Sequence, residues 1–212
     1  MDKRRFTSLW KRCQAGEGTG VRGGDVFKEV HDDYSAPGRF YHTPKHIEHC
    51  LAQFDLVVGE MEDADAVEMA IWFHDLIFDV NVDDNELQSA RRFVELANKS
   101  MNAEFKTRVY DLIMATAPPR LPKTGDQEFM LDIDLSSFGL PWDDFVRDSI
   151  AVRRESPRLS DADFFPGQLA FLESLVSREH FYFTNFFRSR IEESARSNIN
   201  RHLEILRDQG VV

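Results

Sequence analysis

Cysteine is scarce in this sequence, which contains only Cys13 and Cys50. Two cysteines cannot build a disulfide framework, and they are too few for a zinc site made of cysteine ligands. Long hydrophobic runs are also missing, because no stretch approaches the roughly 20 apolar residues that span a bilayer. The basic N-terminal segment lacks the apolar core of a secretory signal peptide. We therefore expect a cytoplasmic protein that has no membrane partner.

Basic residues are fewer than acidic residues as well. The chain has 26 lysines and arginines against 37 aspartates and glutamates, which gives a formal net charge of −11 at pH 7. Such an acidic chain is a poor partner for the phosphate backbone of nucleic acids, so we expect no nucleic-acid partner. Part of the negative charge serves a local purpose if several carboxylates surround a cation.

Strict period-two alternation, which marks half-buried strands, occurs in few segments, so the sequence predicts an all-α fold. Residues 1–24 are expected to form an N-terminal helix and a Gly-rich loop, and residues 25–212 the main helical domain. The loop lacks the Gly-Lys-Ser/Thr ending of a phosphate-binding loop. Helices are expected over residues 4–14, 27–34, 44–58, 66–78, 104–115, 128–139, 143–154, 167–177 and 184–208, with a further helix that starts at 83–85.

Histidine is concentrated in one short region. Four of the seven histidines, and an aspartate beside the last of them, are His42, His46, His49, His74 and Asp75. Neutral imidazole donates a lone pair near pH 7, and a carboxylate offsets the charge of a cation, so this set can bind a metal. The first three have the spacing of one helix face. However, His42 precedes the expected helix start at Thr43-Pro44.

The segment around His74 is apolar almost all round, so we predict that residues 66–78 form the central buried helix. Asp63 or Asp65 is expected to cap it. A His-Asp pair in such a segment is costly unless both side chains are satisfied. The spacing leaves two interpretations open, which are a metal site and a structural hydrogen bond in the core.

Four ordered blocks carry a resemblance to a known family: GRFYHTPKHIEHCL, AIWFHDLIFD, DNELQSA and FMLDIDLSSFG. Together they resemble the H…HD…D signature of the HD-domain superfamily, in particular a bacterial branch of predicted metal-dependent phosphohydrolases. The resemblance covers about residues 35–200. It implies a single-domain helical bundle of the HD-domain type, in which ligands from separate helices converge on a divalent metal ion.

By this resemblance the metal ligands are His42, His74, Asp75 and Asp134, and Asp132 is the neighbour most easily confused with the last. The mixed nitrogen and oxygen donors suit Mn²⁺, Fe²⁺, Ni²⁺, Co²⁺, Zn²⁺ or Mg²⁺ without selecting among them. A bound cation would lower the pKa of a coordinated water. The expected reaction is hydrolysis of a small phosphorylated molecule, with a nucleotide as one candidate. The alternative is a non-catalytic helical module that binds metal or nucleotide.

Other polar residues are candidates for supporting roles. Arg39 could clamp a phosphate oxygen or serve as a structural or surface charge. Asp79 and Glu86 are candidates for general acid or base, or for ordinary carboxylates at helix ends. His46 and His49 could bind substrate phosphate or a second metal, or stabilise the helix surface.

An aromatic group near the C-terminal helix consists of Phe181, Tyr182, Phe183, Phe186 and Phe187. Such rings could stack a nucleobase. A cluster this apolar is more typical of a core or of an interface between copies of the chain, and a homo-oligomer is one expected assembly.

Overall fold

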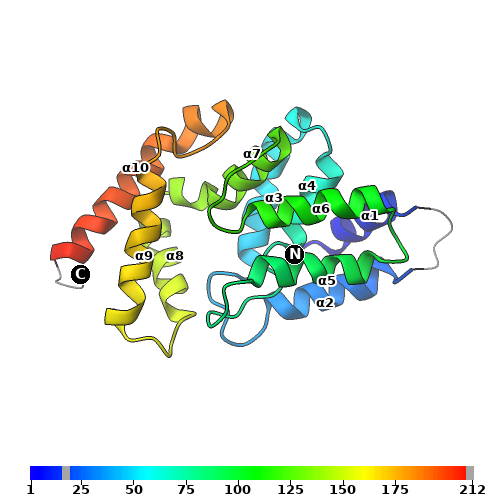
Figure 1. Ribbon diagram of the computed structural model, residues 1–212, viewed down its shortest axis with the longest axis horizontal. Coiled ribbons are helices and arrows are strands. Elements are labelled where there is room, and N and C mark those ends of the chain that lie inside the picture. The colour runs from blue at the N-terminus through cyan, green and yellow to red at the C-terminus, as the bar shows by residue number, and fades with distance from the viewer. Residues whose placement is uncertain (16–19, 209–212) are drawn as a thin grey trace. The chain divides into compact units, whose positions relative to one another are not determined.

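The structure is a computed structural model that describes residues 1–15 and 20–208 (Figure 1). Within these ranges the regular elements are helices and there is no strand, so the all-α prediction is confirmed. The chain divides into two compact units, Met1–Asp134 and Leu135–Val212. Of residues 15–24, which were expected to form a Gly-rich loop, residues 16–19 lie outside the described residues, and Gly23 and Gly24 begin a helix instead.

The first unit contains seven α-helices within the described ranges, and a short 3-10 helix η1 (Val58–Glu60) that follows α3. They are α1 (Lys3–Cys13), α2 (Gly23–Tyr34), α3 (Pro44–Val57), α4 (Ala64–Phe73), α5 (Asn85–Ala97), α6 (Ala103–Ala115) and α7 (Gly125–Asp134). Their starts follow capping chemistry. The side chain of Asp63 accepts a hydrogen bond from the Ala66 N–H at 3.0 Å, and Pro44 occupies the first turn of α3.

Helix α4 is the centre of the first unit. Every residue from Ala66 to Phe73 is buried, and the helix contacts α1, α3, α5, α6 and α7. The one charged side chain in that run, Glu68, is paired with Arg5 at 2.7 Å. A helix that is apolar on almost every side has to be covered on every side, which is the packing predicted for it.

The end of α4 differs from the sequence prediction, which extended this helix to residue 78. The Leu76 N–H bonds to the Phe73 carbonyl at 3.1 Å, so the last turn is tighter than an α-helix. The Ser89 hydroxyl then accepts a hydrogen bond from the Ile77 N–H at 3.0 Å and supplies the partner that a further helical turn would have supplied. The chain therefore leaves the helix directly at the His-Asp pair.

Helix α1 is built into the core of the first unit. The centroids of the Phe6 and Trp72 rings are 5.2 Å apart, and the two rings are arranged edge to face. The Phe6 ring also contacts Trp10, Phe27 and Phe73. The expected separation of residues 1–24 from the main domain stays a prediction.

The second unit contains, in the part that the structure describes, η2 (Leu135–Gly139), α8 (Trp142–Arg154), α9 (Asp161–Val176) and α10 (Asn185–Asp208). Helix α10 packs on η2 and α9. Phe181, Tyr182 and Phe187 are buried, which confirms the core interpretation for these three rings. Helix α9 begins earlier than the predicted residue 167, because Ser160 caps it by accepting a hydrogen bond from the Asp163 N–H.

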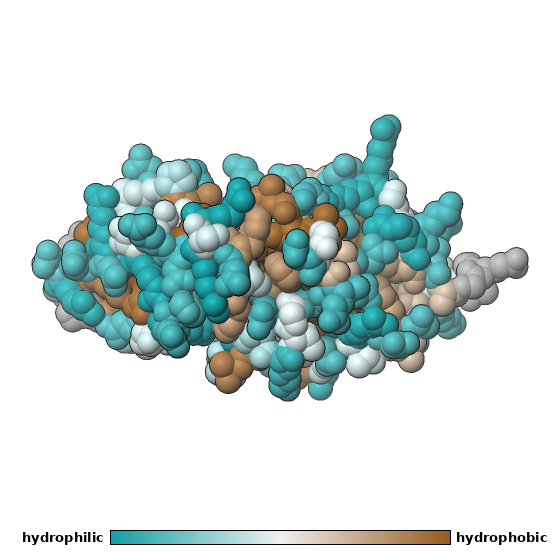
Figure 2. Space-filling view, turned by 90° about the horizontal axis from the view of Figure 1, so that it is seen from above, coloured by the Kyte–Doolittle hydropathy of each residue, from teal (hydrophilic) through white to brown (hydrophobic). Residues whose placement is uncertain are grey.

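Hydrophilic side chains cover most of the face shown in Figure 2, and hydrophobic residues form smaller patches between them. Among the described helices, none combines the length and the apolar character that crossing a membrane requires.

Replacing Phe6 with alanine should lower the free energy of unfolding by about 3–5 kcal/mol, because a fully buried ring is lost from the core. Chemical denaturation followed by circular dichroism measures this loss. The matched control is Leu56→Ala, at an exposed position of the same unit, for which we expect a change within about 0.5 kcal/mol. Equal effects of the two substitutions would show that α1 is not part of the core.

Candidate metal centre

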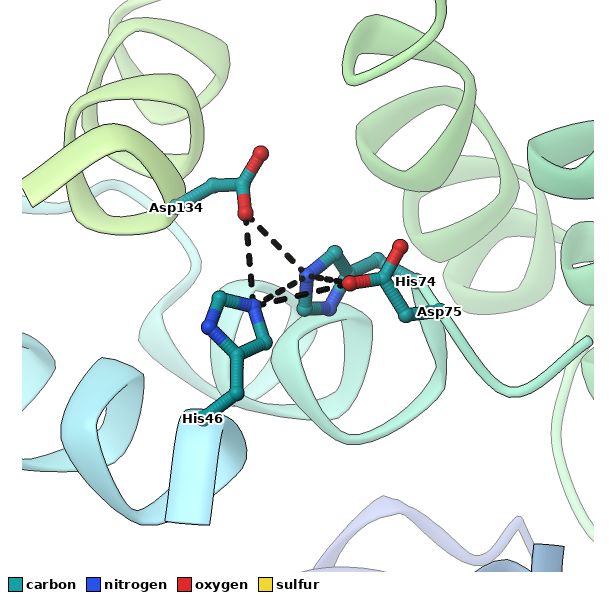
Figure 3. Close-up of side chains that lie close together, drawn as sticks. All are labelled: His46, His74, Asp75 and Asp134. Carbon is teal, nitrogen blue, oxygen red and sulfur yellow. Dashed lines mark hydrogen bonds and ion pairs between the residues drawn. The ribbon is translucent and has the colours of Figure 1, made fainter. Parts of the chain in front are cut away.

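Four polar side chains converge inside the first unit, and Figure 3 shows them pointing toward one another. His46 comes from α3, His74 and Asp75 follow the end of α4, and Asp134 is the last residue of α7. Each offers one ligand atom, and these atoms all lie within 4.8 Å of one another. We call this group the His/Asp cluster.

The side chains of the His/Asp cluster approach one another most closely through the nitrogen and oxygen atoms that could bind a metal. The two histidine Nε2 atoms are 3.2 Å apart, and Asp75 Oδ2 lies 3.0 Å from His74 Nε2. Asp134 Oδ1 lies 3.4 Å from each Nε2 atom. Asp75 Oδ2 lies 3.5 Å from His46 Nε2.

These spacings match the edges of a metal coordination shell. Divalent cations bind imidazole nitrogen and carboxylate oxygen at about 2.0–2.2 Å. At such bond lengths neighbouring donors are about 3.0 Å apart around an octahedral ion and about 3.4 Å apart around a tetrahedral one. The cluster could therefore hold a metal ion with little movement of its side chains.

The orientation of His74 supports the same conclusion. Its Nδ1 lies 3.0 Å from the carbonyl oxygen of Ile71, one turn earlier in α4. An N–H on Nδ1 then donates to that carbonyl and leaves the lone pair of Nε2 directed into the cluster. Metal-binding histidines commonly use their second ring nitrogen in this way, because the contact fixes both tautomer and ring orientation.

Burial differs between the two kinds of ligand. The side chains of His46 and His74 are 2% and 1% exposed, whereas those of Asp75 and Asp134 are 18% and 12% exposed. The carboxylates are therefore the part of the cluster that is closest to solvent.

When no metal is bound, burial and neighbouring charges shift the pKa values of all four groups in the cluster. Burial lowers the pKa of both histidines, but other groups outweigh it. For His46 these groups are Cys50, Tyr41 and the two carboxylates, and for His74 they are the two carboxylates. The pKa values of both histidines therefore lie well above the usual range. Burial raises the carboxylate pKa values, but the histidines outweigh it and hold the pKa of Asp75 and of Asp134 well below the usual range. The cluster is thus ion-paired when no metal is bound.

The ion-paired state has a built-in conflict. Two protonated imidazoles would place like charges on Nε2 atoms 3.2 Å apart, and such pairs repel in a buried site. A divalent cation between neutral imidazoles and ionised carboxylates removes that repulsion and satisfies every donor. The donor chemistry fits a bound metal better than a structural network of protons.

The structure places His46, and not His42, in the cluster. His42 lies beside it, with Nε2 at 3.9 Å from Asp75 Oδ2 and its ring 4.1 Å from the Phe78 ring. The reason is local, because α3 starts at Pro44 and the segment that carries His42 precedes the helix. A signal for His46 was present, since it shares an inward helical face with Cys50 at i+4. The ligand role of His42 stays a prediction.

Arg39 is engaged with backbone. Its guanidinium donates to the carbonyl oxygens of Asp75 at 2.7 Å, Leu76 at 2.6 Å and His42 at 3.2 Å. It also lies over the Tyr34 ring at 5.1 Å. Arg39 therefore braces the turn after α4 against the segment before α3, which supports the structural alternative over a phosphate clamp.

The remaining candidates lie outside the cluster. Asp79 is exposed in the turn after α4 and accepts a hydrogen bond from the Asn81 N–H at 2.9 Å, so the helical turn expected between Asp75 and Asp79 is absent. Glu86 is half-buried in the first turn of α5. His49 is half-buried on α3, where burial and the charge of His46 lower its pKa to about 4. The catalytic and substrate-binding roles of these three stay predictions.

The aspartates of α7 are distinguished by the structure. Asp134 brings its carboxylate into the cluster, as preferred from the sequence. Asp132 is fully buried and is not a member of the cluster.

Comparison with known proteins adds no assignment. No protein-family model, curated protein or solved structure matches this chain. The likeness of the sequence blocks to the HD-domain superfamily stays a prediction, and the geometry of the cluster is the main guide to function.

Replacing Arg39 with alanine should lower the free energy of unfolding by at least about 1.5–3 kcal/mol, because backbone carbonyls lose a charged donor. Urea denaturation measures the loss, and Arg4→Ala, at an exposed position, is the matched control. A variant Arg39→Ala that is as stable as the Arg4 control would argue for a ligand-binding role instead of a brace.

Metal binding should release protons. The raised pKa values of His46 and His74 favour protonated imidazoles, whereas a metal needs neutral imidazoles, so metal affinity should increase as pH rises. Titration calorimetry with Mn²⁺ in two buffers of different ionisation enthalpy counts the protons. Release of no protons at pH 7 would contradict the ion-paired description of the metal-free cluster.

The same pKa shifts determine how the stability of the metal-free protein depends on pH. The raised histidine pKa values stabilise the fold below the unfolded value of about 6.5 and cease to do so as pH rises through the folded values. The lowered pKa values of the aspartates stabilise it above about 3.9 and cease to do so as pH falls through the folded values. The cluster should therefore stabilise metal-free protein most between about pH 4 and 6.5.

Proposed function

We propose that this protein is a metal-dependent phosphohydrolase of the HD-domain type that acts on a small phosphate ester, with nucleotides as the first candidates. The observation that carries the proposal is the convergence of two imidazoles and two carboxylates, with ligand atoms within 4.8 Å of one another, at the end of the central helix. The sequence blocks that resemble the HD-domain superfamily support the same class.

In this proposal His46, His74, Asp75 and Asp134 hold one divalent ion, which is Mn²⁺, Fe²⁺, Ni²⁺, Co²⁺, Zn²⁺ or Mg²⁺. When bound, such an ion lowers the pKa of a coordinated water and polarises a phosphoryl group. The overall reaction forms a bond from the water oxygen to phosphorus and breaks the ester bond. The leaving oxygen takes up a proton, and the products are an alcohol and inorganic phosphate.

In this proposal the role of each side chain depends on its position in the site. The buried imidazoles anchor the ion from inside the first unit, and the partly exposed carboxylates face the side from which substrate arrives. His42, whose Nε2 lies 3.9 Å from Asp75 Oδ2, is proposed to complete the site from that accessible side. Arg39 holds the turn that carries Asp75 through its contact with the Asp75 carbonyl.

Elemental analysis of the purified protein tests the proposal. We expect close to one transition-metal ion per chain in the wild type, and its loss in His74→Ala and Asp134→Ala, because each substitution removes a ligand. Hydrolysis of p-nitrophenyl phosphate and nucleotides should fall by more than about 100-fold in both variants. His31→Ala, at a partly exposed histidine of the same unit, is the control. Full metal occupancy in both ligand variants would contradict the assignment.

A matched pair of variants separates the two histidines near α3. His46→Ala should lose metal as His74→Ala does, whereas His42→Ala should keep more of it, because only His46 belongs to the four-residue cluster. The reverse order would favour the ligand set implied by the family resemblance. Wild-type protein that binds one metal but hydrolyses no phosphate ester would favour the non-catalytic binding module.

A further inference from the structure

Arg120 lies beside the His/Asp cluster, in the segment between α6 and α7. Its Nη1 is 3.1 Å from Asp134 Oδ2, while Oδ1 of the same carboxylate faces the two histidines. One carboxylate thus joins the candidate metal position to a guanidinium. Periodicity does not single out this position, because the segment is a proline-containing loop.

The backbone at Arg120 is unusual for a residue with a side chain. Its φ is 57°, in the left-handed region that non-glycine residues rarely adopt. The turn is closed by a hydrogen bond from the Arg120 N–H to the Ala117 carbonyl at 2.9 Å. Glycine would adopt this conformation without steric cost, whereas arginine adopts it under strain. Strain of this kind is often found at functional sites.

Charge balance identifies a task for this guanidinium. The two positive charges of a bound divalent ion are matched by Asp75 and Asp134, and the two histidines bind as neutral ligands. A metal-loaded cluster is therefore close to neutral, whereas a phosphate monoester carries up to about two negative charges. Binding such an anion in a partly buried site calls for a further positive group next to the metal.

Arg120 and Arg39 differ in how they are placed for that task. Arg39 directs its donors to three backbone carbonyls. Arg120 contacts the carboxylate of Asp134, and the two side chains are 19% and 12% exposed. A guanidinium presents five N–H donors in one plane, so it can contact a carboxylate and a phosphate oxygen together.

We infer that Arg120 binds the phosphate group of the substrate, from a position fixed by its contact with Asp134 beside the metal ligands. The inference rests on the proposed function and adds an anion-binding residue to it. Arg120 takes the role that the sequence suggested for Arg39.

The test is titration calorimetry of inorganic phosphate into protein loaded with Mn²⁺. Arg120→Gly removes the guanidinium and suits the left-handed backbone, so the turn should be kept. We expect phosphate affinity to fall about ten- to hundredfold while the metal content stays near that of the wild type. Arg120→Lys keeps the charge but loses the planar donor pair, so its phosphate affinity should lie between those of the wild type and of Arg120→Gly. Arg108→Ala, at an exposed arginine of α6, should bind phosphate as the wild type does.

Three outcomes would overturn the inference. Unchanged phosphate affinity in Arg120→Gly would show that the guanidinium does not contact the anion. Loss of metal in the same variant would show that Arg120 only positions Asp134. A wild type that holds Mn²⁺ and hydrolyses phosphate esters without binding inorganic phosphate would overturn it too. Failure of the proposed function is distinguished by the wild type alone, which would then hold no metal or hydrolyse no ester.

Discussion

Helix α4 is apolar on almost every side, and five other helices of the first unit pack against it. The chain follows this buried run with a histidine and an aspartate, which cannot be left unsatisfied in such surroundings. The helix ends at Phe73, so both side chains can turn to the same point. Arg39, Tyr34 and Ser89 hold the turn that results, because each bonds to its backbone. The position of the candidate metal centre depends on this termination.

Convergence at that point brings together groups whose charges must be balanced. Protons balance them when no metal is bound, at the expense of placing two imidazole nitrogens 3.2 Å apart. A divalent cation balances the two carboxylates without that repulsion, and the donor spacings suit its coordination shell. Asp134 then has a double role, since one oxygen faces the metal position and the other contacts Arg120. In the proposed function, metal binding and anion binding are linked through this carboxylate.

Much of this arrangement follows from sequence pattern. Helical spacing predicts the helices, and the apolar run predicts the buried position of α4. The resemblance to the HD-domain superfamily implies His74, Asp75 and Asp134 as ligands, and the structure brings these three side chains together. The family resemblance implies His42 as a ligand, whereas the structure brings His46 into the cluster, because the direction in which the first turn of α3 faces α4 and α7 is set by tertiary packing. The contacts of Arg39 with carbonyl oxygens depend on a turn formed far along the chain. Arg120 could not be predicted as a site residue, because its loop has no periodicity and because a positive φ at a residue other than glycine is uncommon.

The most direct test of the central claim is a crystal structure of the protein grown with Mn²⁺, with anomalous diffraction used to locate the metal. The account predicts one strong anomalous peak at about 2.0–2.3 Å from His46 Nε2, His74 Nε2 and one carboxylate oxygen each of Asp75 and Asp134. No peak at this position, with the four side chains still paired to one another, would contradict it.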